Sequence, residues 1–566
     1  MPPSTLERLI DRLDEAKRRF GSGQHKQIEQ LLARLSRHEF KHADLLIRYH
    51  EILLFLRSCP QSPRILQLAE KELASFSQRV ERLRDTGSDL SALDDPEVSG
   101  IVGTSVTDTF SFAIVRWLLR SHGNQIKFNW DWFEDENRLG STWPRFIPLL
   151  EEDAAVEANV PYVEWLRAVR GRVTEVAWLM KRFESLVLAD KERAELYDSL
   201  NLYLSWTPSF RATRTGMRLP RRKIFYHRQP LIQRRDVSLP DGLREPPPIF
   251  RRLSQKQGEA VLDLTRETST IRYRELYGFT HGDAKRVLAV NLDRGVEMFL
   301  VGLPPARRLP LRAYHAAMIF KNGVPVGYFE GLSLCERMES GFNLYYSFRD
   351  GETAWLYARV LNIYHHLLGS TVFTLDPYQI GHENEEGIDS GAFWFYRKLG
   401  FRPTRPRLLQ LAIGEAKKIA SRPSYRTPKK LLRELAAGPM IFELETSRVG
   451  DWDSFQVRNL GLAAQRLMAR QFGGDAQKMR QESLNKICRM LGVNRDDLGQ
   501  AELTIWSEFA VMLALIPNLG VWSDHERQAL AQIIRAKAGA DESRYLKLMQ
   551  KHSLLRAEVI KLGTKL

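Results

Sequence analysis

The sequence predicts an α+β fold in which one mixed-sheet domain lies between all-α domains near the two ends of the chain. Residues 1–95 and 446–566 repeat apolar residues every three to four positions, which is the period of amphipathic helices. Between them, residues 254–411 contain short strand-like runs, two of which flank Asn322-Gly323. Asn-Gly in that setting predicts a tight hairpin, because both central residues of a type I′ turn need a positive φ.

Length and composition narrow the class of protein. A chain of 566 residues is too long for one core and predicts roughly three or four domains. Hydrophobic residues make up 43% of it, which argues against wholesale disorder. No uncharged apolar run is long enough for a membrane span, and the charged N-terminus lacks the apolar core of a signal peptide. We therefore expect a cytoplasmic protein without a membrane partner, and three scattered cysteines agree with a reducing compartment.

Changes in periodicity and charge along the chain predict six segments. They are a helical domain at 1–95, a Trp-rich helical domain at 96–205, a basic, Pro-rich linker or arm at 206–253, the mixed-sheet domain at 254–411, a basic connector at 412–445, and a C-terminal helical domain at 446–566. Aromatic residues at helical spacing are more often core than binding surface, so we expect the tryptophans of the second segment to be mostly buried.

Two basic stretches flank the mixed-sheet domain and account for much of the net charge of +15. Residues 211–252 hold twelve cations against three acids, and residues 402–433 hold ten cations against Glu415 alone. Such stretches can contact a polyanion, for example a tRNA, with Phe225 and Tyr226 placed for stacking in the first of them. The alternative for 211–252 is a solvated linker that lies over an acidic neighbouring surface.

A short metal-binding pattern occurs near the N-terminus. His38-Glu39-Phe40-Lys41-His42 matches HExxH, the zinc-protease helix with two histidine ligands one turn apart. The two histidines share a spacing with Leu35, Leu45 and Tyr49, however, and no third ligand follows. We interpret them as residues on the packing face of a helix and predict no metal site.

Residues 254–411 follow a definite order of predicted elements. A helix precedes the Asn322-Gly323 hairpin, and a strand, FNLYYSF, comes next. A turn at 349–354, a helix at 355–369, a strand at 370–377 and a polar loop follow. The helix GAFWFYRKLG then ends at a glycine and leads into a strand that begins at Phe401.

This order resembles the GNAT superfamily of acyl-CoA-dependent acyltransferases over residues 254–411. The most specific part is FWFYRKLGFRP, which is similar to the family pattern A-x-x-x-Y-x-x-x-G-F at Ala392, Tyr396, Gly400 and Phe401. The resemblance implies a mixed-sheet domain that moves an acetyl-like acyl group from coenzyme A to an amine acceptor.

The resemblance also implies a cofactor site at the turn before residue 355. A glycine turn that opens a helix offers unpaired backbone N–H groups and the positive end of the helix dipole, which suits a diphosphate. The family turn reads Q/R-x-x-G-x-G/A, and anchored on Gly351 this chain differs at the first and last positions, Phe348 and Thr353. The implied cofactor-binding residues are Arg349, Gly351, Glu352, Thr353, Ala354 and Asn384.

Acyl transfer to an amine needs a base for the amine proton and an acid for the departing thiolate. Tyr396 stands where family members often carry the acid, although a helix tyrosine can also simply pack on a sheet. Glu330, Asp376 and His382 are the candidate bases. Asp376 before Pro377 is also a common turn residue, and Glu330 can also face water.

Two classes of function follow. The first is an N-acyltransferase that uses acetyl-CoA or another acyl-CoA, with a variant in which the acceptor or donor is a tRNA or another nucleic acid. The second is a GNAT-like binding or scaffold protein without activity, which the departures at Phe348 and Glu352 favour.

Overall fold

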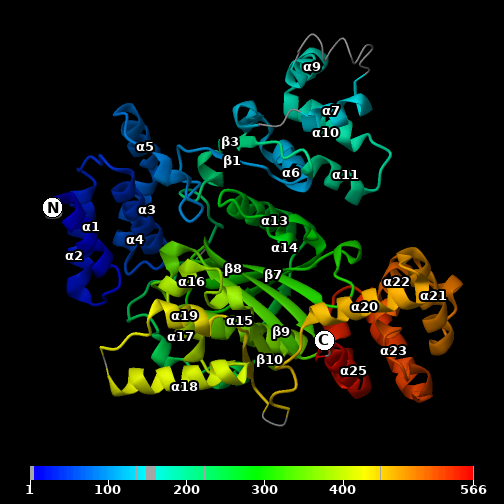
Figure 1. Ribbon diagram of the computed structural model, residues 1–566. Helices are drawn as coiled ribbons and strands as arrows, with labels where there is room; N and C mark the ends of the chain where they lie inside the picture. Colours follow the sequence, from blue (N-terminus) through cyan, green and yellow to red (C-terminus); the bar gives the residue numbers. More distant parts are fainter. Residues whose placement is uncertain are drawn as a thin grey trace.

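The computed structural model describes residues 5–133, 137–147, 161–221, 223–422, 424–445 and 448–564. The fold is a mixed α+β arrangement in which a nine-stranded mixed sheet lies at the centre and helical units surround it (Figure 1). The α+β prediction is thus confirmed.

The N-terminal unit is helical, as the apolar period predicts. Its helices are α1 (Thr5–Ala16), α2 (Ser22–Leu35), α3 (Ala43–Ser58), α4 (Pro63–Ala74) and α5 (Phe76–Asp85). The start of α4 is locally encoded, because the Ser62 hydroxyl accepts a hydrogen bond from Ile65 N–H at 3.2 Å and Pro63 occupies the first turn.

The HExxH segment does not form a helix, so that interpretation was wrong. Residues 36–42 link α2 to α3, and His42 is the extended residue before α3. The cause is Phe40, which is buried and stacks on Tyr49 with ring centroids 5.3 Å apart. Turning Phe40 into the core ends the helical path that would have aligned the two histidines.

The Trp-rich unit contains a small sheet as well as helices. Its elements are β1 (Val106–Asp108), α6 (Phe112–His122), β2 (Ile126–Phe128), α7 (Asn137–Thr142), α9 (Tyr162–Val169), α10 (Glu175–Glu184), α11 (Asp190–Asp198) and β3 (Leu204–Trp206). The three strands form an antiparallel sheet in the order β1-β3-β2, and each is too short for its alternation to stand out in the sequence. Trp117, Trp143 and Trp206 are buried, whereas Trp132 is exposed.

The central sheet has the strand order β11-β12-β10-β9-β8-β7-β6-β5-β4. The strands are β4 (Phe250–Arg252), β5 (Val287–Asn291), β6 (Val296–Val301), β7 (Ala313–Lys321), β8 (Val324–Leu334), β9 (Arg337–Leu344), β10 (Val372–Leu375), β11 (Arg402–Pro403) and β12 (Met440–Glu443). Strands β9 and β10 pair in parallel, and every other neighbouring pair is antiparallel.

The predicted hairpin joins β7 to β8. Asn322 and Gly323 have φ values of 49° and 82°, as a tight turn with two positive φ angles requires. The following strand, β9, ends at Leu344, earlier than expected, and Tyr346–Phe348 forms a short 3-10 turn instead.

Helices cover both faces of the sheet. On one face, α13 (Gln255–Thr270) contributes Val261 and Leu262, and α14 (Tyr277–Thr280) contributes Phe279, to a core shared with Phe299 and Met318 of the strands. On the other face lies α15 (Thr353–Leu368), whose Tyr364 ring stacks on Phe329 of β8 with centroids 4.8 Å apart. The positive φ of Gly369 ends α15, as the sequence predicts.

Strand β12 enters the sheet from the stretch that we assigned to a basic connector. The elements after β10 are α16 (Glu385–Asp389), α17 (Ala392–Arg397), β11, α18 (Pro406–Ser421), α19 (Lys429–Leu435) and β12. Strand β12 lies between β10 and β11 and pairs with both, so the sheet extends beyond residue 411. A four-residue strand after two helices leaves no periodic signal that would predict this.

The C-terminal unit is helical and holds the sheet through buried ion pairs. Its helices are α20 (Val457–Phe472), α21 (Ala476–Leu491), α22 (Gln500–Leu513), α23 (Asp524–Lys537), α24 (Ser543–Lys551) and α25 (Ser553–Thr564). Arg556 of α25 pairs with Glu336 at 2.6 Å, just before β9. None of the described helices combines the length and the apolar character needed to cross a bilayer.

Candidate functional site

A cavity of about 1080 Å³ opens where β9 and β10 separate. The two strands pair only from Arg337↔Val372 to Glu339↔Thr374, and β9 then continues to Leu344 without β10 beside it. The walls come from β8, β9, the turn at 349–354, α16 and α17. The residues just after α1 and the segment 231–234 close one side.

Most of the sequence-predicted site residues meet in this cavity. Those that line it are Glu330, Arg349, Gly351, Thr353, Ala354, Asn384 and Tyr396. Glu352, Asp376 and His382 do not line it. The cavity therefore joins one candidate base and the candidate acid to the predicted cofactor turn.

The turn before α15 presents donors to the cavity. Gly351 N–H donates to the Phe348 carbonyl at 3.0 Å, and a Cβ on Gly351 would stand 3.0 Å from that oxygen, so a larger residue would disturb the turn. Within residues 345–368, all of which are described, no group accepts a hydrogen bond from the backbone N–H of Thr353 or Ala354. Such free donors in a first helical turn suit an anion.

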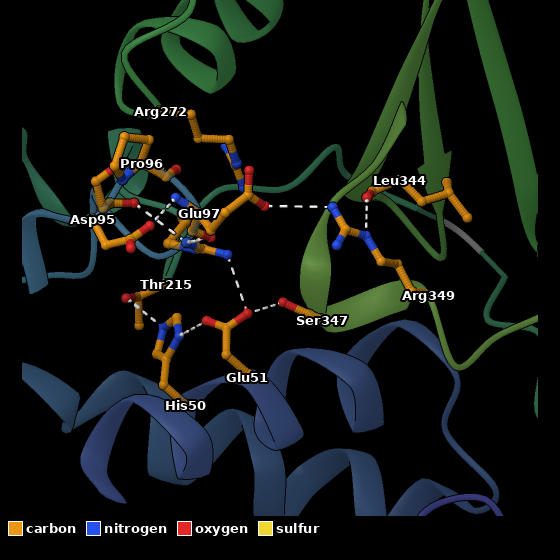
Figure 2. Close-up of polar contacts among 12 residues, drawn as sticks. His50, Glu51, Asp95, Pro96, Glu97, Thr215, Arg272, Leu344, Ser347 and Arg349 are labelled. Atoms are coloured by element: carbon orange, nitrogen blue, oxygen red, sulfur yellow. Dashed lines mark hydrogen bonds and ion pairs between the residues drawn. The ribbon is translucent and has the colours of Figure 1, made fainter. Parts of the chain in front are cut away.

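Arg349 spans the mouth of the cavity from this turn. Its guanidinium donates to the Leu344 carbonyl at 3.0 Å, lies 3.5 Å from a carboxylate oxygen of Glu97, and pairs with Glu386 of α16. Figure 2 shows Arg349 extended between Leu344 and Glu97. The side chain is partly exposed, so it can exchange a carboxylate partner for a bound anion.

Glu352 is the N-cap residue of α15 and does not itself line the cavity. Its carboxylate accepts hydrogen bonds from Lys321 at 2.8 Å and from Ile232 N–H at 3.1 Å, and pairs with Arg294 at 2.5 Å. Burial would raise the pKa of Glu352, but Lys321 and Arg294 lower it to about 2. Its negative charge is thus balanced by the positive charges of Lys321 and Arg294.

Tyr396 of α17 is almost fully buried at the wall of the cavity. Its hydroxyl oxygen accepts a hydrogen bond from the Gln379 amide at 3.0 Å, and no described residue accepts its proton. Burial raises the pKa of Tyr396, so the phenol stays protonated at neutral pH. A protonated hydroxyl at a cavity wall is suited to act as an acid.

Glu330 is the candidate base that the cavity contains. It stands on β8 opposite Gly341 of β9, and its carboxylate accepts a hydrogen bond from the Tyr314 hydroxyl. Burial raises the pKa of Glu330, and the Tyr314 hydrogen bond opposes that change. A carboxylate with a raised pKa is a better proton acceptor near neutral pH than an exposed one.

The remaining predicted residues have local roles. Asp376 is exposed and caps the next turn by accepting a hydrogen bond from Tyr378 N–H at 2.9 Å. His382 is exposed, and its backbone N–H donates to the Pro377 carbonyl. Asn384 accepts from Gly387 N–H at 3.1 Å and donates to the Tyr378 carbonyl at 3.0 Å, which fixes the start of α16 at the rim of the cavity.

The cavity also contains residues that no motif pointed to. Gln379 bridges the opening between the strands, because its amide donates both to the Phe342 carbonyl of β9 at 2.9 Å and to Tyr396. Near Glu330, the Tyr328 hydroxyl accepts hydrogen bonds from Arg274 at 3.1 Å and Asn343 at 3.3 Å. Tyr328 and Glu330 are two positions apart on β8 and therefore lie on the same face of the strand. That spacing is the sequence signal for the part of the cavity wall that β8 forms.

A buried polar network fastens the turn to the N-terminal unit (Figure 2). Glu51 of α3 accepts a hydrogen bond from the Ser347 hydroxyl and pairs with Arg214 at 3.1 Å. His50 bridges Glu51 at 3.0 Å and the Thr215 hydroxyl at 2.9 Å. Burial would raise the pKa of Glu51, but Arg214 and His50 lower it to about 2, so the carboxylate is charged.

Three arginines of the first basic stretch pair with carboxylates elsewhere in the protein. Arg214 is buried, Arg218 pairs with Glu70 at 2.6 Å, and Arg221 lies 3.8 Å from Glu297. These contacts hold residues 214–221 against acidic side chains of other units.

The second basic stretch keeps more charge at the surface. Lys429 and Arg433 of α19 pair with Asp389 and Glu385 of α16. In the part of this stretch that the structure describes, Lys417, Arg422 and Lys430 are exposed and form no ion pair. This surface is joined to the cavity through α16.

Searches for related proteins add no homologue to this picture. Neither protein-family models, nor curated proteins, nor solved structures match the chain. No cluster of three or more metal-ligating side chains occurs among the described residues. The site has to be interpreted from its own geometry.

Proposed function

We propose that the chain is an N-acyltransferase of the GNAT type, which moves an acetyl-like group from an acyl-CoA to an amine. The observation that carries this proposal is the cavity between β9 and β10, which brings Glu330, Tyr396 and the turn before α15 together. The order of hairpin, β9, turn, α15, β10, α17 and β11 supports the same family resemblance. Tyr396 on α17 and Gly400 shortly before β11 are the motif residues that support the proposal.

The residues present fit a coenzyme A thioester. The free N–H groups of Thr353 and Ala354 and the guanidinium of Arg349 would hold the diphosphate. The inward wall, which includes Phe342, Leu344 and Phe395, offers apolar surface to an uncharged arm. The bound thioester supplies an activated acyl carbon for attack by an amine.

Two side chains then accept and donate the protons that move during the transfer. The new N–C bond forms as the C–S bond breaks. Glu330, as carboxylate, accepts the proton that the attacking amine loses, and the Tyr396 hydroxyl gives its proton to the departing thiolate sulfur. The Tyr314 hydroxyl keeps the carboxylate of Glu330 oriented, and Gln379 keeps the phenol of Tyr396 oriented. Solvent restores both groups after the product leaves.

Thiol release tests this proposal directly. The full chain with acetyl-CoA and a panel of primary amines, including free amino acids, polyamines and lysine peptides, should release free thiol only when an acceptor is present. Acetyl-CoA should also raise the melting temperature, since a ligand that binds the folded state stabilises it. Stabilisation without thiol release would support a binding or scaffold protein, and no stabilisation at millimolar acetyl-CoA would overturn the proposal.

A nucleic-acid acceptor or donor is a variant of the same function. The exposed cations Lys417, Arg422 and Lys430 support it, because α19 is ion-paired to α16, which forms the rim of the cavity. The affinity for tRNA should fall steeply with salt through counterion release.

A further inference from the structure

Three arginines from outside the sheet line one side of the cavity. Arg18 and Arg19 follow α1, and Arg234 lies in the 3-10 turn Arg234–Asp236. They belong to segments that the family resemblance does not cover. We call Arg18, Arg19 and Arg234 the arginine cluster.

The arginine cluster is attached to the predicted cofactor turn. Lys17 and Arg18 lie 3.2 Å and 3.5 Å from carboxylate oxygens of Asp350. Ile232 N–H donates to Glu352, two residues from Arg234, so the segment 231–234 passes along the same turn. The cluster therefore lies beside the N-terminus of α15, and both features face one cavity.

The charges of the cluster are unequally matched. Arg19 pairs with Glu15 at 3.0 Å, and Arg18 shares Asp350 with Lys17. Arg234 has no carboxylate partner among the described residues, and its guanidinium donates a weak hydrogen bond of 3.4 Å to the Lys398 carbonyl. A guanidinium that lines a cavity without a counterion has its donors available for a phosphate.

The neighbouring residue provides a contrast. Arg235 lies in the same turn but does not line the cavity, its side chain is 80% exposed, and it lies 3.8 Å from Asp236. Of these two adjacent arginines, Arg234 therefore lines the cavity and Arg235 faces solvent.

We propose that the arginine cluster is a second anion subsite, which takes a phosphate monoester separate from the diphosphate held by the turn before α15. This rests on the proposed function and makes it more specific. The ligand is a nucleotide with both a diphosphate and an isolated phosphate, which is the chemistry of 3′-phosphorylated coenzyme A and not of its 3′-dephospho form. Segments outside the sheet therefore select the donor.

Calorimetric titration of the full chain tests the subsite with coenzyme A and 3′-dephospho-coenzyme A. We expect the unmodified protein to bind coenzyme A about 5- to 10-fold more tightly, the value of roughly one screened arginine–phosphate contact. Arg234→Gln should remove most of that preference and leave the affinity for the dephospho form unchanged. Arg235→Gln is the matched control and should behave as the unmodified protein. The preference should also shrink at high salt.

The outcomes separate this inference from the proposed function. Equal affinity for the two forms, or an Arg234→Gln change that weakens both alike, overturns the subsite while leaving the acyltransferase proposal standing. If neither form binds, the acyltransferase proposal fails, and adenosine 3′,5′-bisphosphate then tests the cluster alone. Binding of that bisphosphate that Arg234→Gln weakens supports the subsite, and no binding overturns it. A loss of tRNA binding in Arg234→Gln with unchanged preference between the two coenzymes would assign the cluster to nucleic acid instead.

Discussion

Glu51 and Ser347 are 296 positions apart in the sequence and share a buried hydrogen bond. Glu51 belongs to α3 of the N-terminal unit, and Ser347 lies in the turn that leads from β9 to α15. The contact holds the turn between β9 and α15 in place. The N-terminal unit, which the family resemblance does not cover, therefore contributes to the geometry of the cavity.

Replacing Glu51 by glutamine should destabilise the protein in a pH-dependent way. The pKa of Glu51 is about 2 in the folded protein against 4.5 as its ordinary value, because Arg214 and His50 outweigh burial. The charged carboxylate thus contributes stability above pH 4.5, on the order of 3 kcal/mol, and this is lost as the pH falls toward 2. Urea unfolding of Glu51→Gln should show the largest loss at pH 7 and a smaller loss near pH 3.

An exposed glutamate supplies the control for that experiment. Glu81→Gln on α5 should leave the unfolding midpoint nearly unchanged at both pH values. If the loss in Glu51→Gln were the same at pH 7 and pH 3, the charge of Glu51 would not be the stabilising feature.

Tyr396→Phe should reduce turnover without loss of donor binding. The variant keeps the buried ring and removes the proton that the thiolate receives, so we expect kcat for thiol release to fall by about 100-fold. Gln379 keeps its second hydrogen bond, to Phe342, so the stability cost should be about 1 kcal/mol. An unchanged kcat would show that Tyr396 only packs against the sheet.

The pH profile of activity should report Glu330. Because burial raises its pKa, kcat/KM should increase with pH through a value above the ordinary carboxylate range, as the base loses its proton. Glu330→Gln should lose this limb and about 100-fold in rate. Tyr314→Phe removes the hydrogen bond that lowers the pKa of Glu330, so it should move the limb to higher pH.

Asp376 and His382 allow the choice of base to be checked. Both are exposed and lie outside the cavity walls, so Asp376→Asn and His382→Ala should retain the wild-type pH profile. Loss of the acid limb in either variant, with Glu330→Gln still active, would transfer the role of base away from β8.

The nucleic-acid variant predicts a defined salt response. The triple variant with glutamine at Lys417, Arg422 and Lys430 should weaken tRNA binding and reduce the slope of log affinity against log salt by up to about 3. Filter binding between 50 and 300 mM salt measures that slope. Acetyl-CoA binding should be unaffected, and a flat salt response of the unmodified protein would exclude this variant.

The sequence predicted those turns and helix ends whose backbone angles require particular residue types. The Asn322-Gly323 turn needs two positive φ angles, and Gly369 ends α15 in the left-handed region, so both could be recognised from residue type. Strands β5 and β6 were not predicted. Asp293, Arg294 and Gly295 all have positive φ in the turn between them, and Arg294 in the middle is not a usual turn residue. The HExxH pattern misled because Phe40 packs on Tyr49 of the next helix, in a segment that is not itself helical.

The family pattern in the sequence points to only part of the cavity lining. Tyr396 and the turn around Gly351 follow from the motif, whereas the arginine cluster depends on segments more than a hundred residues upstream. The ion pairs of Glu352 likewise involve Lys321 and Arg294, which no spacing in the sequence relates to it.

The position of β12 sets the order in which the protein can be completed during synthesis. Strand β10 pairs with β9 along one edge and with β12 along the other. Strand β11 pairs only with β12. Until Met440–Glu443 has left the ribosome, both strands expose unpaired edges that invite association between nascent chains. A chain that stops after α18 should therefore aggregate, although it would contain the whole sequence motif.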